Sequence, residues 1–217
     1  MDSGVAAIIL DFDGVILESA ALKAQVFEEL FARYPDVQDR AVAFHRARPG
    51  ISRERKFGHL VNDLLGRSDP ALVSSLSAEF GCIVEERIAT CHLVTGAAAL
   101  LTRWHGRVPL YVASSTPETE LVRIVARLGL RSFFARVAGD TGPKPRLVAG
   151  LVADEHLVPT RTWFLGDSVS DFEAAVASGV HFIGIGHNID LRARASVCVA
   201  DLVEADRYLT AAERGEA

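Results

Sequence analysis

The 217-residue sequence is poor in cysteine and has no excess of positive charge. Its three cysteines, Cys82, Cys91 and Cys198, are an odd number and include no C-x-x-C pair, so they indicate no redox motif. Cys82 and Cys91 stand among apolar residues and are expected to be small residues of the core. The formal net charge of −5 argues against a general nucleic-acid binder, because such proteins are usually basic.

Long apolar runs are also missing. None approaches the roughly 18 residues that cross a bilayer, and the N-terminus MDSGVAAIIL lacks the positive leader of a secretory signal. The seven histidines form no H-E-x-x-H or other paired arrangement, which disfavours a zinc site. We expect a cytoplasmic protein with no membrane or nucleic-acid partner, and its oligomeric state stays open.

What the chain does contain is apolar material in short runs, within an ordinary globular composition. Residues 5–10, VAAIIL, are uninterrupted and predict a strand buried on both faces of a parallel sheet. Further strands are expected at 108–113, at 134–138, in TWFLGDS, in HFIGIG and in ASVCVA. Helices are expected after Gly96, from Thr116 to Leu128, over 146–155, over 169–178 and at the C-terminus.

A helical block from about residue 20 to 93 separates the first two strands. Apolar residues recur there at helical spacing, and Asp69 with Pro70 is typical of a capped helix start. Elsewhere strands and helices alternate, which predicts an open parallel α/β sheet with helices on both faces. We therefore expect an α/β core of residues 1–17 and 95–217, with residues 18–94 inserted as a helical subdomain.

Polar side chains follow the predicted strands. In open parallel sheets, ligands bind outside the carboxyl ends of the strands, so these residues are candidates for one site. Following the first, second and fourth strands, and in the loop beyond the third, they are Asp11, Asp13, Gly14, Ser114, Ser115, Lys144, Gly166, Asp167, Ser168 and Asp171.

Each of these signals alone has an ordinary explanation. Asp11 and Asp13 could begin a calcium loop, but an EF-hand needs a glycine at its sixth position and a preceding helix. Here Gly14 is fourth, and a strand precedes it. Asp167 could cap a helix, and the GPKP around Lys144 could be a plain turn. Their common place at or beyond strand ends favours one shared site.

Taken together, these segments resemble the haloacid dehalogenase superfamily, specifically its phosphatase-like members with a helical, C1-type cap. DFDGVILES resembles the first family motif, VASS the second, Lys144 the third and GDSVSD the fourth. They stand in the family's order over nearly the whole chain. The resemblance implies a Rossmann-like core sheet, with residues 18–94 as the cap.

The resemblance further implies a Mg²⁺-dependent phosphatase that hydrolyses a small phosphorylated metabolite through an aspartyl-phosphate. Asp11 would be the nucleophile and Asp13 the general acid and base. The phosphoryl oxygens would be held by Ser114, Lys144 and backbone N–H groups around Gly14 and Ser115. The metal would be held by Asp11, the backbone carbonyl of Asp13 and Asp167, with Asp171 supporting nearby.

Two rival functions remain open. Asp13 argues against the dehalogenases and the phosphonate-cleaving members, because those generally lack an acid at this position. It does not exclude a phosphomutase of the beta-phosphoglucomutase type, which uses an acid there as well. A catalytically silent binding protein is the second rival, and the intact set of motif residues speaks against it.

The segment RARPGISRERK, residues 46–56, carries five basic residues and one acid. Its ordinary explanation is the solvated, charged start of a helix. The functional alternative is a loop at Pro49-Gly50 facing the core, with Arg53 or Lys56 reaching an anionic or hydroxyl-rich substrate. Arg53 is therefore a candidate substrate-binding residue.

Overall fold

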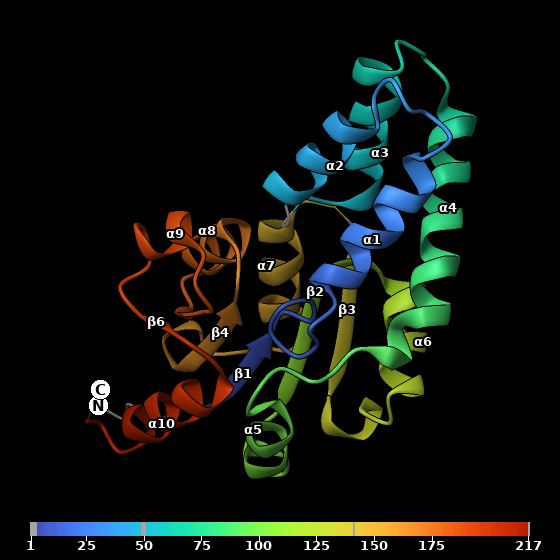
Figure 1. The fold of residues 1–217 in the computed structure, drawn as a ribbon. Coiled ribbons are helices and arrows are strands. Elements are labelled where there is room, and N and C mark those ends of the chain that lie inside the picture. The colour runs from blue at the N-terminus through green and yellow to red at the C-terminus, as the bar shows by residue number, and fades with distance from the viewer. Residues whose placement is uncertain (1–3, 49–50, 141, 217) are drawn as a thin grey trace. The chain divides into compact units, whose positions relative to one another are not determined.

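A computed structural model of the chain describes residues 4–48, 51–140 and 142–216. The predicted loop at Pro49-Gly50 lies outside the described residues. Within them, a six-stranded sheet has the order β3-β2-β1-β4-β5-β6, and every neighbouring pair is parallel (Figure 1). Its strands are β1 (Ala7–Leu10), β2 (Leu110–Pro117), β3 (Arg136–Asp140), β4 (Thr162–Gly166), β5 (His181–Ile185) and β6 (Cys198–Val199).

Helices follow the strands and cover the sheet (Figure 1). They are α5 (Ala97–Trp104), α6 (Glu118–Arg127), α7 (Lys144–Asp154), α8 (Val169–Ser178), α9 (Ile189–Arg192) and α10 (Leu202–Glu213), with 3₁₀ turns η3 (Arg131–Phe133) and η4 (Pro159–Arg161). The predicted parallel α/β fold is confirmed.

Strand β1 lies inside the sheet and is buried on both faces, as its apolar run predicted. Ala7 and Ile9 belong to one core with Val148 of α7 and Ala174 of α8. Ile8 and Leu10 point to the opposite face, because side chains alternate along a strand. The strand thus fixes the direction in which the following loop leaves the sheet.

Of the boundaries that differ from the sequence-based expectation, three lie at candidate site residues or next to them. Strand β2 continues through Ser114 and Ser115 to Pro117, so the helix expected from Thr116 begins only at Glu118. The pairing of β2 with β3 shifts register between Ala113 and Pro117, which allows this extension. Lys144, expected in a loop, is the first residue of α7, because the two flanking prolines favour a helix start there.

The chain divides into two compact units, one of Met1–Glu18 with His92–Ala217 and one of Ser19–Cys91. The sequence placed these boundaries after residues 17 and 94. The first unit contains the sheet. The described part of the second is helical: α1 (Ala20–Phe31), α2 (Gln38–Ala47), α3 (Arg53–His59), the π-helix η1 (Leu60–Leu64), α4 (Pro70–Arg87) and the 3₁₀ turn η2 (Ile88–Thr90).

Aromatic side chains form the core of the second unit. Phe27 stacks on Phe31 and Phe57 with ring centroids 5.0 and 5.3 Å apart, and Phe80 meets Phe27 edge-on. The side chain of Asp69 accepts a hydrogen bond from Leu72 N at 3.0 Å, so the predicted helix start of α4 is confirmed.

Cys82 is exposed and Cys91 half-buried, so the expectation that both belong to the core is wrong. Among the described residues, none of the helices combines the length and the apolar character that a membrane crossing requires.

Candidate active site

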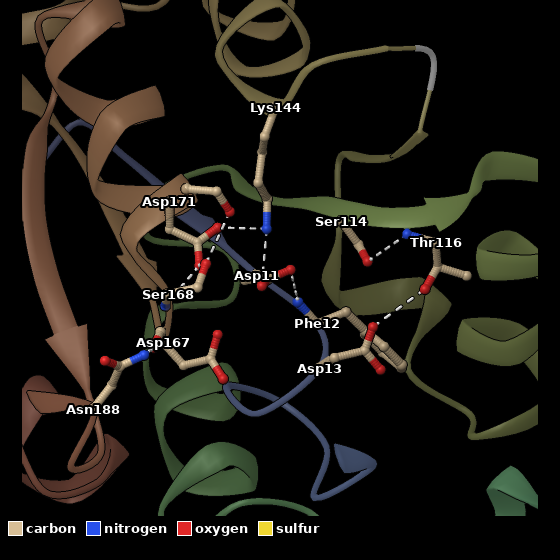
Figure 2. Close-up of polar contacts among 11 residues, drawn as sticks. Asp11, Phe12, Asp13, Ser114, Thr116, Lys144, Asp167, Ser168, Asp171 and Asn188 are labelled. Carbon is tan, nitrogen blue, oxygen red and sulfur yellow. Dashed lines mark hydrogen bonds and ion pairs between the residues drawn. The ribbon is translucent and has the colours of Figure 1, made fainter. Parts of the chain in front are cut away.

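The carboxyl end of β1 carries Asp11 to an edge of the sheet. Asp11 N donates to Leu165 O at 2.9 Å, which continues the ladder between β1 and β4 past the end of β1. The Asp11 carboxylate accepts a hydrogen bond through Oδ1 from Phe12 N at 2.7 Å (Figure 2). Its side chain is almost fully buried, so backbone contacts hold this carboxylate in one orientation.

Lys144, at the start of α7, reaches the same place. Its Nζ lies 2.8 Å from Asp11 Oδ2 and forms a second ion pair with Asp171 Oδ1 (Figure 2). The lysine is only 5% exposed, so both pairs are shielded from water. One ammonium group thereby links the end of β1 to the first turn of α8.

Asp171 belongs to the first turn of α8 and is completely buried. Its Oδ2 accepts hydrogen bonds from Ser168 N at 3.0 Å and from Ser168 Oγ at 2.5 Å. The bond from Ser168 N is one half of a capping box; in the other half the Asp171 N–H donates to the Ser168 side chain, and together they fix the start of the helix. Gly166 makes room for it, because a Cβ there would lie 2.3 Å from Asp171 Cβ.

Asp167 lies between β4 and α8, close to the loop that follows β1. Gly14 in that loop has φ +78°, and a Cβ at this position would lie 2.2 Å from Asp167 Oδ2. The Gly14 N–H donates to Leu17 O at 2.8 Å, so this hydrogen bond holds the loop after β1 together from within. Asn188 Nδ2 donates to Asp167 O at 3.4 Å from the other side (Figure 2).

The geometry of these acids suits a hard divalent cation. Carboxylate oxygens of Asp11, Asp167 and Asp171 all lie within 4.8 Å of one another. Oxygen donors without histidine or cysteine are the set that Mg²⁺ prefers. Three carboxylates face one lysine here, so a bound cation of charge +2 would balance the cluster when all are ionised.

Burial and crowding show in the acidity of these groups. Burial raises the pKa of Asp11 to about 7, against the opposing effect of Lys144, and the charges of Asp171 and Asp13 add to the rise. Burial also raises the pKa of Asp167 well above its ordinary value, with Asp11 and Asp171 adding to it. For Lys144 burial acts against the charged form, but Asp11 and Asp171 more than offset it, so its pKa is raised.

Asp13 faces a different partner. Thr116 Oγ1 donates to Asp13 Oδ2 at 3.2 Å, and Thr116 N donates to Ser114 Oγ at 3.1 Å (Figure 2). Asp11 points toward Lys144, whereas Asp13 points toward Thr116 (Figure 2). The two acids of the first loop therefore have separate environments, one next to a cation and one next to a hydroxyl group.

The structure brings together most of the predicted site residues, and all of those belong to the unit that contains the sheet. Ser114 is fully buried and Ser115 half-buried, both within β2. Arg53 belongs to the helical unit, where its guanidinium lies over the Phe80 ring at 4.9 Å and donates to Ser77 O at 3.5 Å.

Sequence reasoning missed two contacts of this site. The role of Thr116 had a visible signal, since it stands two residues after Ser114, but its position was assigned to a helix start. Asn188 gave no such signal, because its contact with Asp167 O joins segments 21 residues apart.

Comparison with known proteins places this geometry in a family. Residues 8–185 match the family described as haloacid dehalogenase-like hydrolase. The phosphoglycolate phosphatase of Synechococcus elongatus is 27% identical over 187 residues, which cover 82% of each chain. The phosphorylated carbohydrates phosphatase of Thermotoga maritima is 24% identical over 197 residues, covering 85% of this chain and 87% of that protein.

A solved structure of CbbY from Rhodobacter sphaeroides in complex with phosphate has the same fold, with a TM-score of 0.77 at 19% identity. The match covers 92% of this chain and 96% of that one. The predicted phosphatase type of enzyme is confirmed by the family and by the two phosphatases. With its family motifs spread across a matched span that includes most of the sheet, this chain belongs to the haloacid dehalogenase-like hydrolase family.

Proposed function

We propose that this protein is a Mg²⁺-dependent phosphatase that hydrolyses a small phosphorylated metabolite through an aspartyl-phosphate on Asp11. One observation carries the proposal: Asp11 is buried beside Lys144 and two further carboxylates, while Asp13 lies on the same loop in a separate environment. A nucleophile needs the first environment and a general acid the second.

Charge repulsion explains why the nucleophile needs a positive charge beside it. A carboxylate that attacks a phosphate dianion meets two like charges, each costing roughly 4 kcal/mol at 4 Å and an effective dielectric constant near 20. Lys144 lies 2.8 Å from Asp11 Oδ2 and is placed to pair with both the nucleophile and the phosphoryl oxygens. Ser114, whose Oγ accepts from Thr116 N, retains its own hydroxyl hydrogen for a phosphoryl oxygen.

The acidic cluster supports the metal part of the proposal. Asp11, Asp167 and the backbone carbonyl of Asp13 would hold Mg²⁺, which when bound supplies positive charge between nucleophile and phosphate. Both oxygens of Asp171 are engaged by Lys144 and Ser168, so Asp171 supports the site by holding that lysine and the start of α8.

The chemistry requires two proton transfers by one residue. As Asp11 attacks phosphorus, the bond from phosphorus to the leaving oxygen breaks, and Asp13 donates its proton to that oxygen. Water then attacks the aspartyl-phosphate, and the Asp13 carboxylate removes a proton from this water molecule. Phosphate leaves and the Asp11 carboxylate is restored. The contact of Asp13 with Thr116 keeps it apart from the ion pair of Asp11.

We further propose a division of labour between the two units. The sheet-containing unit would carry the reaction, since every candidate catalytic and metal-binding residue lies in it. The helical unit Ser19–Cys91 would act as the cap that selects the substrate, with Arg53 as one contact. The names of the two relatives support phosphoglycolate and phosphorylated carbohydrates as the first substrates to test.

A screen of phosphorylated metabolites tests the proposal. Phosphate release is measured with Mg²⁺ and with EDTA, using Asp11→Asn as the control for contaminating activity. We expect EDTA-sensitive release that the variant lacks.

The same screen separates the rivals. A phosphoryl group retained on a sugar 1-phosphate, with its position changed, would identify a phosphomutase. Absence of turnover by well-folded protein across the panel would favour a silent binding protein.

A further inference from the structure

We propose that Thr116 is a positioning residue that orients Asp13 for proton transfer and couples it to Ser114. This inference rests on the proposed function, because it assigns the support of the residue that would act as acid and base. Thr116 is not one of the polar groups expected at the strand ends.

A hydrogen bond joins Thr116 directly to Asp13. Thr116 Oγ1 donates to Asp13 Oδ2 at 3.2 Å, and Thr116 is only 4% exposed (Figure 2). A contact shielded from water fixes a half-buried carboxyl group better than solvent does. Because the hydroxyl donates to Oδ2, it favours a carboxyl proton on Oδ1. The transferable proton is thereby assigned to one oxygen.

Thr116 is also linked to Ser114. The backbone N–H of the same threonine donates to Ser114 Oγ at 3.1 Å. One residue therefore contacts the group proposed to hold the phosphoryl oxygen and the group proposed to protonate the leaving oxygen. Their separation is set by a single backbone position.

The backbone position of Thr116 is fixed by its strand. Thr116 lies in the part of β2 where the register with β3 shifts, between Ala113 and Pro117. Gly139 on β3 permits the close approach, since a Cβ there would lie 2.7 Å from Thr116 O and 2.2 Å from Glu118 Cα. Irregular strand segments of this kind are used to re-aim side chains near functional sites. Here the side chain re-aimed is that of Thr116.

The test compares Thr116→Val, which keeps the shape and removes the hydroxyl, with Thr116→Ser, which keeps the hydroxyl. Exposed Thr119→Val on α6 is the matched control. Each variant is assayed with Mg²⁺ on p-nitrophenyl phosphate, whose leaving group needs little protonation, and on an alkyl phosphate, whose leaving group needs it. Circular dichroism and thermal melting confirm folding.

We expect Thr116→Val to lower kcat/KM on the alkyl ester by roughly tenfold or more, as loss of part of general acid catalysis would do. Its kcat/KM on p-nitrophenyl phosphate should stay within about threefold, because this ratio covers the reaction only as far as departure of the leaving group and omits the hydrolysis step that both esters share. Thr116→Ser should restore the alkyl-ester rate, and Thr119→Val should match wild type.

Equal losses of kcat/KM on both esters by Thr116→Val would overturn the inference, and so would a Thr116→Ser variant as impaired as the valine variant. Wild-type rates on both esters in Thr116→Val would overturn it as well. In each case wild-type turnover leaves the proposed function standing. Absence of any wild-type turnover would overturn the proposed function itself, and this inference with it.

Discussion

Gly14 and Asp167 lie so close that a Cβ on the glycine would sit 2.2 Å from the aspartate Oδ2. The loop after β1 and the loop after β4 are therefore packed backbone against side chain. Asp167 can keep its place beside Asp11 only if residue 14 has no side chain.

The variant Gly14→Ala should displace Asp167 and weaken Mg²⁺ binding. Its φ of +78° adds about 1–2 kcal/mol of backbone strain for a residue with a Cβ. We expect at least a tenfold higher Mg²⁺ concentration for half-maximal phosphate release. Titration calorimetry with Mg²⁺ measures the same change without turnover.

Gly129→Ala is the matched control for that variant. Gly129 has φ +71° in the same unit, but its added Cβ would meet nothing within 4 Å. It should share the strain and keep the wild-type Mg²⁺ dependence. Equal Mg²⁺ dependence in the two alanine variants would show that contact with Asp167 is not what matters at position 14.

Lys144→Met should separate metal binding from turnover. The variant removes the cation that pairs with Asp11 and Asp171, so the remaining carboxylates should bind Mg²⁺ more tightly than in wild type. Phosphate release should nevertheless fall by at least 100-fold, because the phosphoryl oxygens lose their ammonium partner. Calorimetry and a phosphate assay measure the two effects.

Lys144→Met should also be less stable than the wild type. Without Mg²⁺ its free energy of unfolding should fall by about 3 kcal/mol, since two buried acids lose their partner. Mg²⁺ should raise the free energy of unfolding of Lys144→Met by more than it raises that of the wild type, because the variant binds the ion more tightly. Exposed Arg146→Met on α7 also removes one positive charge, and it should leave Mg²⁺ affinity, phosphate release and the free energy of unfolding unchanged. Weaker Mg²⁺ binding by Lys144→Met would contradict the charge argument.

The sequence was sufficient to predict where the acids and the lysine meet. Asp11 and Asp167 follow apolar runs that can only be buried strands, and parallel strands end at one edge. Asp171 and Ser168 interact within four residues, so their capping box is a local feature. Most of the cluster follows from strand order and from contacts close in sequence.

The direction in which Asp13 points could not be predicted in this way. It depends on Thr116, which is 103 residues away in sequence, and on the shifted register of β2 against Gly139. That register results from packing between two strands, and the hydrophobic pattern of neither strand indicates it. The start of α7 at Lys144 was missed because helix ends depend on a few backbone contacts.

Asp11→Asn and Asp13→Asn should fail in different ways. The first removes the nucleophile and should abolish phosphate release from every ester. The second removes the proton donor, so its loss of kcat/KM should be roughly 100-fold or more on an alkyl phosphate and much smaller on p-nitrophenyl phosphate. Steady-state kinetics on both esters measures the difference in kcat/KM, which excludes the hydrolysis step that the two esters share. Equal losses of kcat/KM by Asp13→Asn on the two esters would count against Asp13 as the acid.

His45 in the helical unit should make folding stability fall below neutral pH. Its ring stacks on Phe27 at 4.4 Å, and its buried Nδ1 has no hydrogen-bond partner within the part of the chain that the structure describes. Burial lowers the pKa of His45 to about 3, and the cations Lys56, Lys23 and Arg46 add to this effect. Below about pH 6.5 His45 therefore binds a proton in the unfolded chain but not in the folded chain.

Unfolding by urea at pH 7.5 and pH 5.5 measures this contribution, which should lower the free energy of unfolding by about 1.4 kcal/mol at the lower pH. His45→Phe keeps the stacked ring and cannot ionise, so its loss between the two pH values should be smaller by that amount. The variant should also be more stable at pH 7.5, because the unsatisfied Nδ1 is gone. Exposed His92→Phe should keep the wild-type pH dependence. If His45→Phe also kept it, the histidine would be protonated in the folded protein, which would contradict the argument from burial and the neighbouring cations.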